Sequence, residues 1–301
     1  MSSLYPHLIE TAIAQLDLLT TERVRSIFAK RFIYHEQVSD VIKHAEYLIN
    51  KPRGVRPTGL LVSGPSGAGK TALAEALMRQ SGAQQATRER AATMPILFFS
   101  MTNAREAKEI FTRFLEALGY PHTSTLTGSQ RRLEALKLAA AASLCLLIVD
   151  EIQDVLLSTV RQQQLALLAL KDIMNSLKIP LLALGTEDAR VALEAVPSLK
   201  SRFEMRELPI WRSDEYLRHF LESYESTLPL KKRSNLGSLT MMRLIVKETG
   251  GLLCNIVDRI QRAAALAIES GEEHITKELF ERARFEFPKT IVAGMTGGER
   301  P

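Results

Sequence analysis

The sequence lacks long apolar runs, has few cysteines and contains few aromatic side chains. No stretch reaches the roughly 18 apolar residues of a transmembrane helix, and the first residues lack the basic and apolar regions of a signal peptide. The two cysteines, Cys145 and Cys254, stand far apart in apolar patterns, which predicts buried free thiols in a reducing compartment. We therefore expect a cytoplasmic protein with no membrane partner.

Features that mark several classes of metal-binding and nucleic-acid-binding proteins are also missing. The six histidines have no metal-ligand spacing, and the chain has no zinc-finger pattern, no RNA-binding aromatic signature and no long basic tail. There is a moderate basic excess, with a net charge of +5 and a pI near 9.2. This charge permits contact with nucleic acid but does not establish it.

Short apolar runs alternate with helical patterns through the middle of the chain, and 46% of all residues are apolar. Such alternation predicts a parallel sheet that helices cover on both faces, and hence an α/β fold. The expected strands are residues 59–63, 95–100, 144–151, 180–186 and, shorter, 203–210. The expected helices between them are residues 70–82, 103–120, 130–142 and 161–178.

Both ends of the chain have helical periodicity only. Apolar residues recur at three- and four-residue steps before the first strand, and strand patterns are absent from about Trp211 onward. We therefore expect four segments: a helical N-terminal segment (1–30), an α/β nucleotide-binding domain (31–210), a small all-helical domain (211–287) and a flexible tail (288–301).

A phosphate-binding loop follows the first expected strand. Its sequence, GPSGAGKT, fits the pattern G-x-x-x-x-G-K-[ST] between a strand and a helix. In this pattern backbone N–H groups surround the β-phosphate, Lys70 neutralises the β- and γ-phosphates, and the Thr71 hydroxyl faces Mg²⁺. The sequence thus predicts ATP and Mg²⁺ binding by Gly64, Pro65, Ser66, Gly67, Ala68, Gly69, Lys70 and Thr71.

An acidic pair closes the third expected strand, LCLLIVDE. Asp150 would lie beside the phosphate loop, where its carboxylate can hold the hydration shell of Mg²⁺. The neighbouring Glu151 is placed to polarise a water for attack on the γ-phosphate. A water-activating glutamate favours hydrolysis of ATP over phosphoryl transfer to a second substrate.

Two later residues are further candidates. Thr186 ends the fourth expected strand, and its hydroxyl could reach the γ-phosphate or the attacking water. Arg202 follows a short helix and precedes the last strand, where it could stabilise transition-state charge at a neighbouring subunit's nucleotide. For Arg202 a surface salt bridge is the alternative role.

In their order along the chain, these motifs resemble those of the AAA+ ATPases. The order is a phosphate loop, a strand ending in Ser100, the DE strand, a strand ending at Thr186, the sequence SRF at 201–203, and a helical lid. Within that superfamily the chain is most similar to the transposition ATPases of the TniB and TnsC type, over about residues 25 to 285. The resemblance implies a P-loop AAA+ core with a parallel five-stranded sheet and a C-terminal helical lid.

The resemblance also implies a function. Such proteins bind ATP between subunits and assemble on duplex DNA as rings or helical filaments, without reading its sequence. They present target DNA to a transposase, with or without a target-selector protein, and ATP hydrolysis, slow or partner-stimulated, disassembles them. In this family the residues matching Ser100 restrain the catalytic glutamate, those matching Tyr34 and His35 border the adenine, and those matching Thr186 and Arg202 are the first sensor and the trans-acting arginine.

One position departs from the superfamily pattern. Many AAA+ lids begin a helix with an arginine, the second sensor, but the equivalent position here is Leu253. Either the lid senses nucleotide without an arginine, or the alignment is shifted at this point.

The candidate DNA contacts lie between the second and third expected strands, where members of this family line a central pore. Their hydroxyls and cations suit contact with DNA phosphates without base readout. The alternative is a solvated helix face and a flexible loop. The candidates are Thr102, Arg105, Lys108, Thr125, Thr127 and Arg131.

Three other functions compete with a regulator of transposition. A helicase loader or replication initiator of the same superfamily is the nearest, although no winged-helix domain is evident after the lid. A small-molecule P-loop kinase is disfavoured by the DE pair and the helical lid. A signalling NTPase would normally carry long repeat or effector domains.

Overall fold

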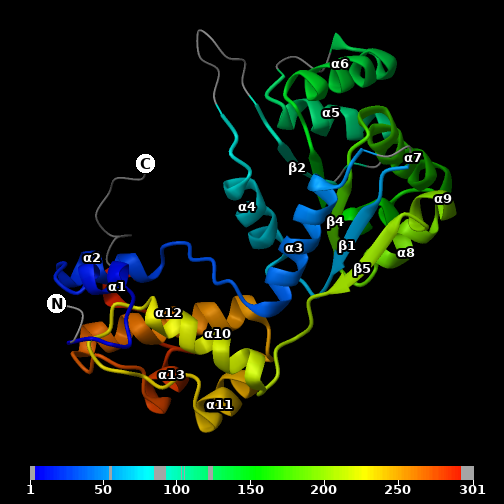
Figure 1. Ribbon diagram of the computed structural model, residues 1–301. Helices are drawn as coiled ribbons and strands as arrows, with labels where there is room; N and C mark the ends of the chain where they lie inside the picture. The colour runs from blue at the N-terminus through cyan, green and yellow to red at the C-terminus, as the bar shows by residue number, and fades with distance from the viewer. Residues whose placement is uncertain are drawn as a thin grey trace. The chain divides into compact units, whose positions relative to one another are not determined.

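The computed structural model describes residues 4–53, 56–84, 93–102, 104, 106–120 and 125–292. The chain forms two compact units (Figure 1). The first, the helical unit, contains residues up to 36 and from 210 onward; the second, the α/β unit, contains residues 37–209.

The α/β unit is built on a parallel five-stranded sheet with the strand order β2-β3-β4-β1-β5. The inner strands are apolar up to their carboxyl ends, as expected for a sheet that is covered on both faces. This arrangement confirms the predicted α/β P-loop fold. The strands are β1 (Gly59–Ser63), β2 (Ile96–Ser100), β3 (Leu146–Asp150), β4 (Leu181–Gly185) and β5 (Phe203–Glu207).

Helices cover both faces of this sheet (Figure 1). One face packs on α5 (Ala107–Ala117), α6 (Gly128–Ala141) and α7 (Val160–Leu177), whose apolar residues share one core cluster with Leu97, Val149 and Ala183. The other face is covered by α3 (Glu36–Asn50) and α4 (Lys70–Gln80). Since all strands are parallel, their carboxyl ends meet at a single edge, where Ser100 lies opposite Asp150 and Ser63 opposite Gly185.

Three short helices complete the α/β unit. Periodicity did not reveal η2 (Ile152–Leu157) or α8 (Ala189–Glu194), because six residues make too few turns to show a helical repeat. The third, α9 (Pro197–Lys200), is the short helix expected before Arg202.

The helical unit combines both ends of the chain around one apolar core. Val24 and Ile27 from the N-terminal end share this core with Trp211, Tyr224 and the helices that follow. Helix α2 therefore packs with the C-terminal helices, and α1, whose Ala12 belongs to a separate small cluster with Leu8 and Leu16, lies in the same compact unit. Its helices are α1 (Glu10–Gln15), α2 (Thr20–Ile27), α10 (Glu215–Ser226), α11 (Leu239–Thr249), α12 (Leu253–Ser270), α13 (Lys277–Arg282) and α14 (Lys289–Val292).

Both cysteines are free, but Cys254 is exposed and Cys145 is only partly buried. The expectation of two buried thiols was therefore wrong. On α12 the buried stripe includes Ile256 and Ile260, and Cys254 lies two residues, or about 200° of helical rotation, from the first of these. Within the described residues, none of the helices is both long enough and apolar enough to span a bilayer.

Candidate nucleotide-binding site

The phosphate loop joins the carboxyl end of β1 to the first turn of α4. Gly67 and Gly69 have φ angles of 81° and 95°, a region that favours glycine. Gly64 is required for a different reason, because a Cβ atom there would lie 2.6 Å from the carbonyl oxygen of Leu208. The loop thus delivers the free N–H groups of a helix N-terminus to one place, an arrangement suited to a phosphate.

Lys70 is buried inside this loop, with 5% of its surface exposed. Its Nζ donates hydrogen bonds to the carbonyl oxygens of Gly64 (2.8 Å) and Pro65 (2.9 Å). Burial lowers the pKa of Lys70, while the carboxylates of Glu151 and Asp150 act in the opposite direction. The ammonium group is therefore held where it can neutralise phosphate oxygens.

Thr71 and Asp150 meet as the two sequence motifs predict. The Thr71 hydroxyl donates a 2.7 Å hydrogen bond to Oδ2 of Asp150, a residue with 3% of its surface exposed. The other carboxylate oxygen, Oδ1, accepts a 2.9 Å bond from the backbone N–H of Glu151. A hydroxyl and a carboxylate in contact are hard oxygen ligands, so this pair fits Mg²⁺ and its hydration shell.

Glu151 has a left-handed backbone conformation, with φ 54° and ψ 40°. This conformation is uncommon for a residue with a side chain and is often found at functional sites. It separates β3 from η2, so the glutamate follows Asp150 directly at the carboxyl edge of the sheet.

Gln153, which no sequence motif marks, links the two predicted catalytic positions. Its Nε2 donates a short hydrogen bond to Oε2 of Glu151. Its Oε1 accepts a 3.1 Å hydrogen bond from the backbone N–H of Thr186. This connection could not be read from the sequence, because it depends on how η2 folds against the end of β4.

The Thr186 hydroxyl oxygen is buried, and no hydrogen-bond partner is found for it within the described residues. An orphaned hydroxyl at the carboxyl edge of the sheet needs a polar partner to offset its burial. A phosphate oxygen or the attacking water would be such a partner, so this observation fits the predicted sensor role.

Ser100 lies at the same edge, but its hydroxyl pairs with that of Thr102 at 2.7 Å. The backbone N–H of Thr102 also donates to the Ser100 hydroxyl, at 3.1 Å. The side chain that bonds the carboxylate of Glu151 is Gln153. Restraint of Glu151 by Ser100 therefore stays a prediction.

The two residues predicted to border adenine belong to the helical unit. Tyr34 is exposed, and its ring packs edge-on against Phe32 with centroids 5.0 Å apart. The ring of His35 lies 4.9 Å from that of Trp211, and burial lowers the pKa of His35 to about 4. Their contact with a base remains a prediction.

Arg202 immediately precedes β5, at the amino edge of the sheet. Its Nη1 donates a 2.8 Å hydrogen bond to Oδ1 of Asn175, and its buried Nε has no partner within the part of the chain that the structure describes. Burial, and then the charge of Arg56, lower the pKa of Arg202. Arg56 itself donates a short hydrogen bond to the hydroxyl of Ser201.

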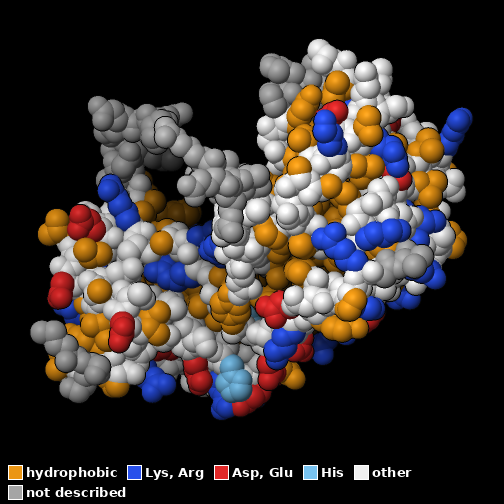
Figure 2. All heavy atoms as spheres, turned by 45° about the horizontal axis from the view of Figure 1, so that its top comes forward, with side chains coloured by type: hydrophobic (Ala, Val, Ile, Leu, Met, Phe, Trp, Pro, Cys, Tyr) orange, Lys and Arg blue, Asp and Glu red, His pale blue; other side chains and the backbone are white. Residues whose placement is uncertain are grey.

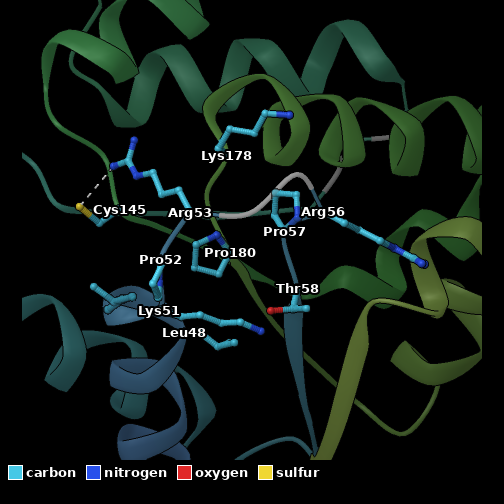
Figure 3. Close-up of a pocket in the computed structure, with 11 residues that line it drawn as sticks. Leu48, Lys51, Pro52, Arg53, Arg56, Pro57, Thr58, Cys145, Lys178 and Pro180 are labelled. Carbon is cyan, nitrogen blue, oxygen red and sulfur yellow. Dashed lines mark hydrogen bonds between the residues drawn. The ribbon is translucent and has the colours of Figure 1, made fainter.

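The amino edge also holds a small basic pocket of about 60 Å³ (Figure 3). Arg53 reaches towards Cys145, whereas Arg56 extends in the opposite direction (Figure 3). The described residues that line the pocket include no acid and four cations: Lys51, Arg53, Arg56 and Lys178. The carboxyl edge differs, since the end of β3 and the segments that follow β3 and β4 carry the acids Asp150, Glu151, Asp154, Glu187 and Asp188, beside the single phosphate-loop cation Lys70.

The candidate DNA contacts have different surroundings. Thr102 and Lys108 are exposed, and Thr125 is exposed just before α6. Thr127 caps α6, where its hydroxyl accepts a hydrogen bond from the N–H of Gln130. Arg105 lies outside the described residues.

Arg131 is buried, with 7% of its surface exposed. Its guanidinium donates to the carbonyl oxygen of Leu126 and to the hydroxyl of Thr112, so it joins α6 to α5. This placement disfavours Arg131 as a DNA contact. Figure 2 shows basic side chains at several places on the face in view, with acidic and apolar side chains between them.

Comparison with known proteins identifies the family. A family model described as bacterial TniB protein matches residues 23–213, which is more than half of the chain. The chain therefore belongs to the TniB family, as its motifs predict. The comparison with curated protein sequences gave no match.

Solved structures of low sequence identity share the AAA+ fold. The Aeropyrum pernix ORC2 protein in ADPNP-ADP complexes is 18% identical, with a TM-score of 0.63, over 86% of this chain and 70% of that one. The Aeropyrum pernix ORC1 protein in complex with DNA is 19% identical, with a TM-score of 0.62, over 87% and 68%. The Thermotoga maritima RuvB Holliday junction branch migration motor is 16% identical, with a TM-score of 0.52, over 87% and 72%.

Proposed function

We propose that this protein is an ATPase that assembles on duplex DNA without sequence preference and regulates transposition. The observation that carries the ATPase proposal is the contact of Thr71 with Asp150 at the mouth of the phosphate loop, with Glu151 directly beside it. Membership of the TniB family supports the link to transposition.

The residues of the site have distinct tasks in hydrolysis. The loop amides and Lys70 bind the β- and γ-phosphates and offset their charge. Thr71 and Asp150 would hold Mg²⁺, which when bound would neutralise charge at the phosphate oxygens. Glu151 orients a water and accepts its proton, and Thr186 offers its buried hydroxyl to the same region.

Arg202 would act on the nucleotide of a neighbouring copy. Lys70 follows the carboxyl end of β1, whereas Arg202 precedes the amino end of the adjacent β5. Five residues of strand at about 3.3 Å each separate these ends by roughly 15 Å, too far for Arg202 to reach the phosphates of its own subunit. Action in trans requires that the amino edge of one copy face the carboxyl edge of the next.

The charges at the two edges favour this head-to-tail contact. The amino edge carries Lys51, Arg53, Arg56 and Lys178, and the carboxyl edge carries mostly acids. An interface between two different faces of the same chain yields a ring when the rotation closes and a helical filament when it does not. A homo-oligomer of either kind completes the nucleotide site with Arg202.

DNA binding is proposed through the region between β2 and β3. Thr102, Lys108 and Thr125 offer exposed polar or basic side chains there, and Arg105 stays a candidate by its place in the sequence. Cations and hydroxyls contact phosphates of any sequence, so the duplex would be held without base readout.

Within this proposal the partner is a transposase, with or without a target-selector protein, and hydrolysis releases the assembly from DNA. The alternative is a helicase loader or a replication initiator, which the fold shared with the ORC proteins keeps open. The two functions differ in their partner. A transposition regulator in its ATP-bound assembly would stimulate strand transfer by a transposase, whereas a helicase loader or initiator would promote loading of a replicative helicase.

Electron microscopy tests the proposal. Wild-type protein is incubated with duplex DNA and a slowly hydrolysed ATP analogue, and Lys70→Ala protein serves as the control. The proposal predicts rings or filaments on DNA for the wild type only. Monomers under all conditions, or assemblies that form equally with Lys70→Ala, would contradict it.

A further inference from the structure

We infer that Gln153 is a positioning residue for hydrolysis, which holds the carboxylate of Glu151 and fixes it to the end of β4. The inference rests on the proposed ATPase function and names a residue outside its motifs. It follows from the two hydrogen bonds that the Gln153 amide makes, one to Glu151 and one to the backbone of Thr186.

The two bonds use the two different ends of the amide. The N–H end donates to Oε2 of Glu151, which leaves Oε1 of that carboxylate to accept a proton from water. The C=O end accepts from the N–H of Thr186, a group fixed by the adjoining strand β4. Gln153 thereby tethers the flexible Glu151 side chain to the rigid sheet. Fewer Glu151 rotamers then have to be excluded when the reaction takes place.

Gly185 leaves room for the bridge, by which we mean the two hydrogen bonds of the Gln153 amide to Glu151 and Thr186. A Cβ atom at Gly185 would lie 2.4 Å from Oε1 of Gln153 and 2.7 Å from Cβ of Ala189. A larger residue at the end of β4 would thus displace the Gln153 amide. The glycine, the glutamine and the left-handed Glu151 fit one another as a local unit.

The bridge needs a side chain that donates at one end and accepts at the other. Leucine can do neither, and an ionised glutamate could accept from Thr186 but would repel Glu151. A neutral histidine has one donor and one acceptor nitrogen, which flank the same ring carbon as the two amide atoms of glutamine flank Cδ, so it offers one donor and one acceptor. Histidine is therefore the substitution expected to rescue the function of Gln153.

The test compares three variants of the full chain. ATP turnover is measured at saturating and limiting ATP, with and without duplex DNA, for Gln153→Leu, Gln153→His and the control Gln163→Leu. Gln163 also loses two amide hydrogen bonds, to the carbonyl oxygens of Leu156 and Ser158, and neither bond involves Glu151. ATP affinity and thermal unfolding are measured in parallel.

We expect Gln153→Leu to lower kcat by about 10- to 100-fold with ATP affinity changed less than about twofold, because only the position of the base is lost. Gln153→His should recover most of the loss, and Gln163→Leu should behave like the wild type. In a Glu151→Gln background, Gln153→Leu should have little further effect, since it acts through Glu151.

Three results would overturn the inference. One is unchanged kcat in Gln153→Leu, a second is no rescue by histidine, and a third is an equal loss in both the wild-type and Glu151→Gln backgrounds. A wild type without any ATP turnover would overturn the proposed ATPase function itself, and with it this role. Normal wild-type turnover with an unaffected Gln153→Leu would overturn the inference alone.

Discussion

Buried charges serve different ends in the two units of this protein. In the helical unit, Arg23 bonds Glu273 and the carbonyl oxygen of Pro229, and Glu225 accepts three backbone N–H bonds from residues 234 to 236. In the α/β unit, Lys70 and Asp150 face the phosphate loop.

The partners of a buried charge indicate whether the charge stabilises the fold or serves a ligand site. In the helical unit Arg23 and Glu225 stabilise chain segments that have no regular structure of their own, so the value of these two charges is structural. At the carboxyl edge of the sheet the partners are loop carbonyls and a hydroxyl, groups that ATP and Mg²⁺ can replace or share. Buried Arg131 is the instructive exception, because it lies in the α/β unit and still joins two helices.

The largest expected effect concerns Arg202. Arg202→Ala should lower turnover of the DNA-bound assembly by about 1,000-fold, the usual effect of losing an arginine that stabilises phosphoryl transfer. Turnover of Arg202→Ala protein is measured alone and after mixing with Glu151→Gln protein, which keeps the phosphate loop but lacks its own base. Mixing should restore activity, because each Glu151→Gln copy supplies an intact Arg202; a mixture that stays inactive would contradict action in trans.

Lys70→Ala should impair ATP binding by the α/β unit without changing the stability of the protein. It should weaken ATP binding by about 100-fold, since the charge on the β- and γ-phosphates loses its buried counter-charge. Calorimetric titration with ATP measures the affinity, and thermal unfolding serves as the control. Unchanged affinity would remove the basis of the proposed site.

Glu225 is the buried charge of the helical unit to compare with Lys70, and its removal should change stability. Glu225→Ala leaves the three N–H groups of Ser234, Asn235 and Leu236 without their acceptor and should destabilise the protein by about 3 kcal/mol. Urea unfolding followed by circular dichroism measures the change. A loss below about 1 kcal/mol would mean that water satisfies these groups as well as Glu225 does.

His35 should make the free energy of unfolding depend on pH. Its pKa is about 4 in the folded state because of burial, against about 6.5 when unfolded. The unfolded state thus binds the proton first, and stability falls as pH drops from about 6.5 towards 4, by at most about 1.4 kcal/mol per pH unit.

The measurement is urea unfolding at several pH values for the wild type and His35→Phe. His35→Phe should flatten the pH dependence between 6.5 and 4. An equal slope in the wild type and His35→Phe would show that His35 titrates normally.

Much of the fold and site could be predicted because the deciding signals are local. Alternating strand and helix patterns predicted the parallel sheet, and two short motifs predicted the meeting of Thr71 with Asp150. The rest depends on contacts between elements. Gln153 acquires its partners only when η2 lies against β4, and the burial of Arg131 depends on how α6 packs on α5.

The central claim, nucleotide-dependent binding of duplex DNA, is tested most directly by fluorescence anisotropy. Two unrelated duplexes are titrated with wild-type and Lys70→Ala protein across a salt series, with and without a non-hydrolysable ATP analogue. The account predicts that the wild type with the analogue binds both duplexes about equally, and that affinity falls steeply as salt rises. Binding to one duplex only, or equal binding without nucleotide, would contradict it.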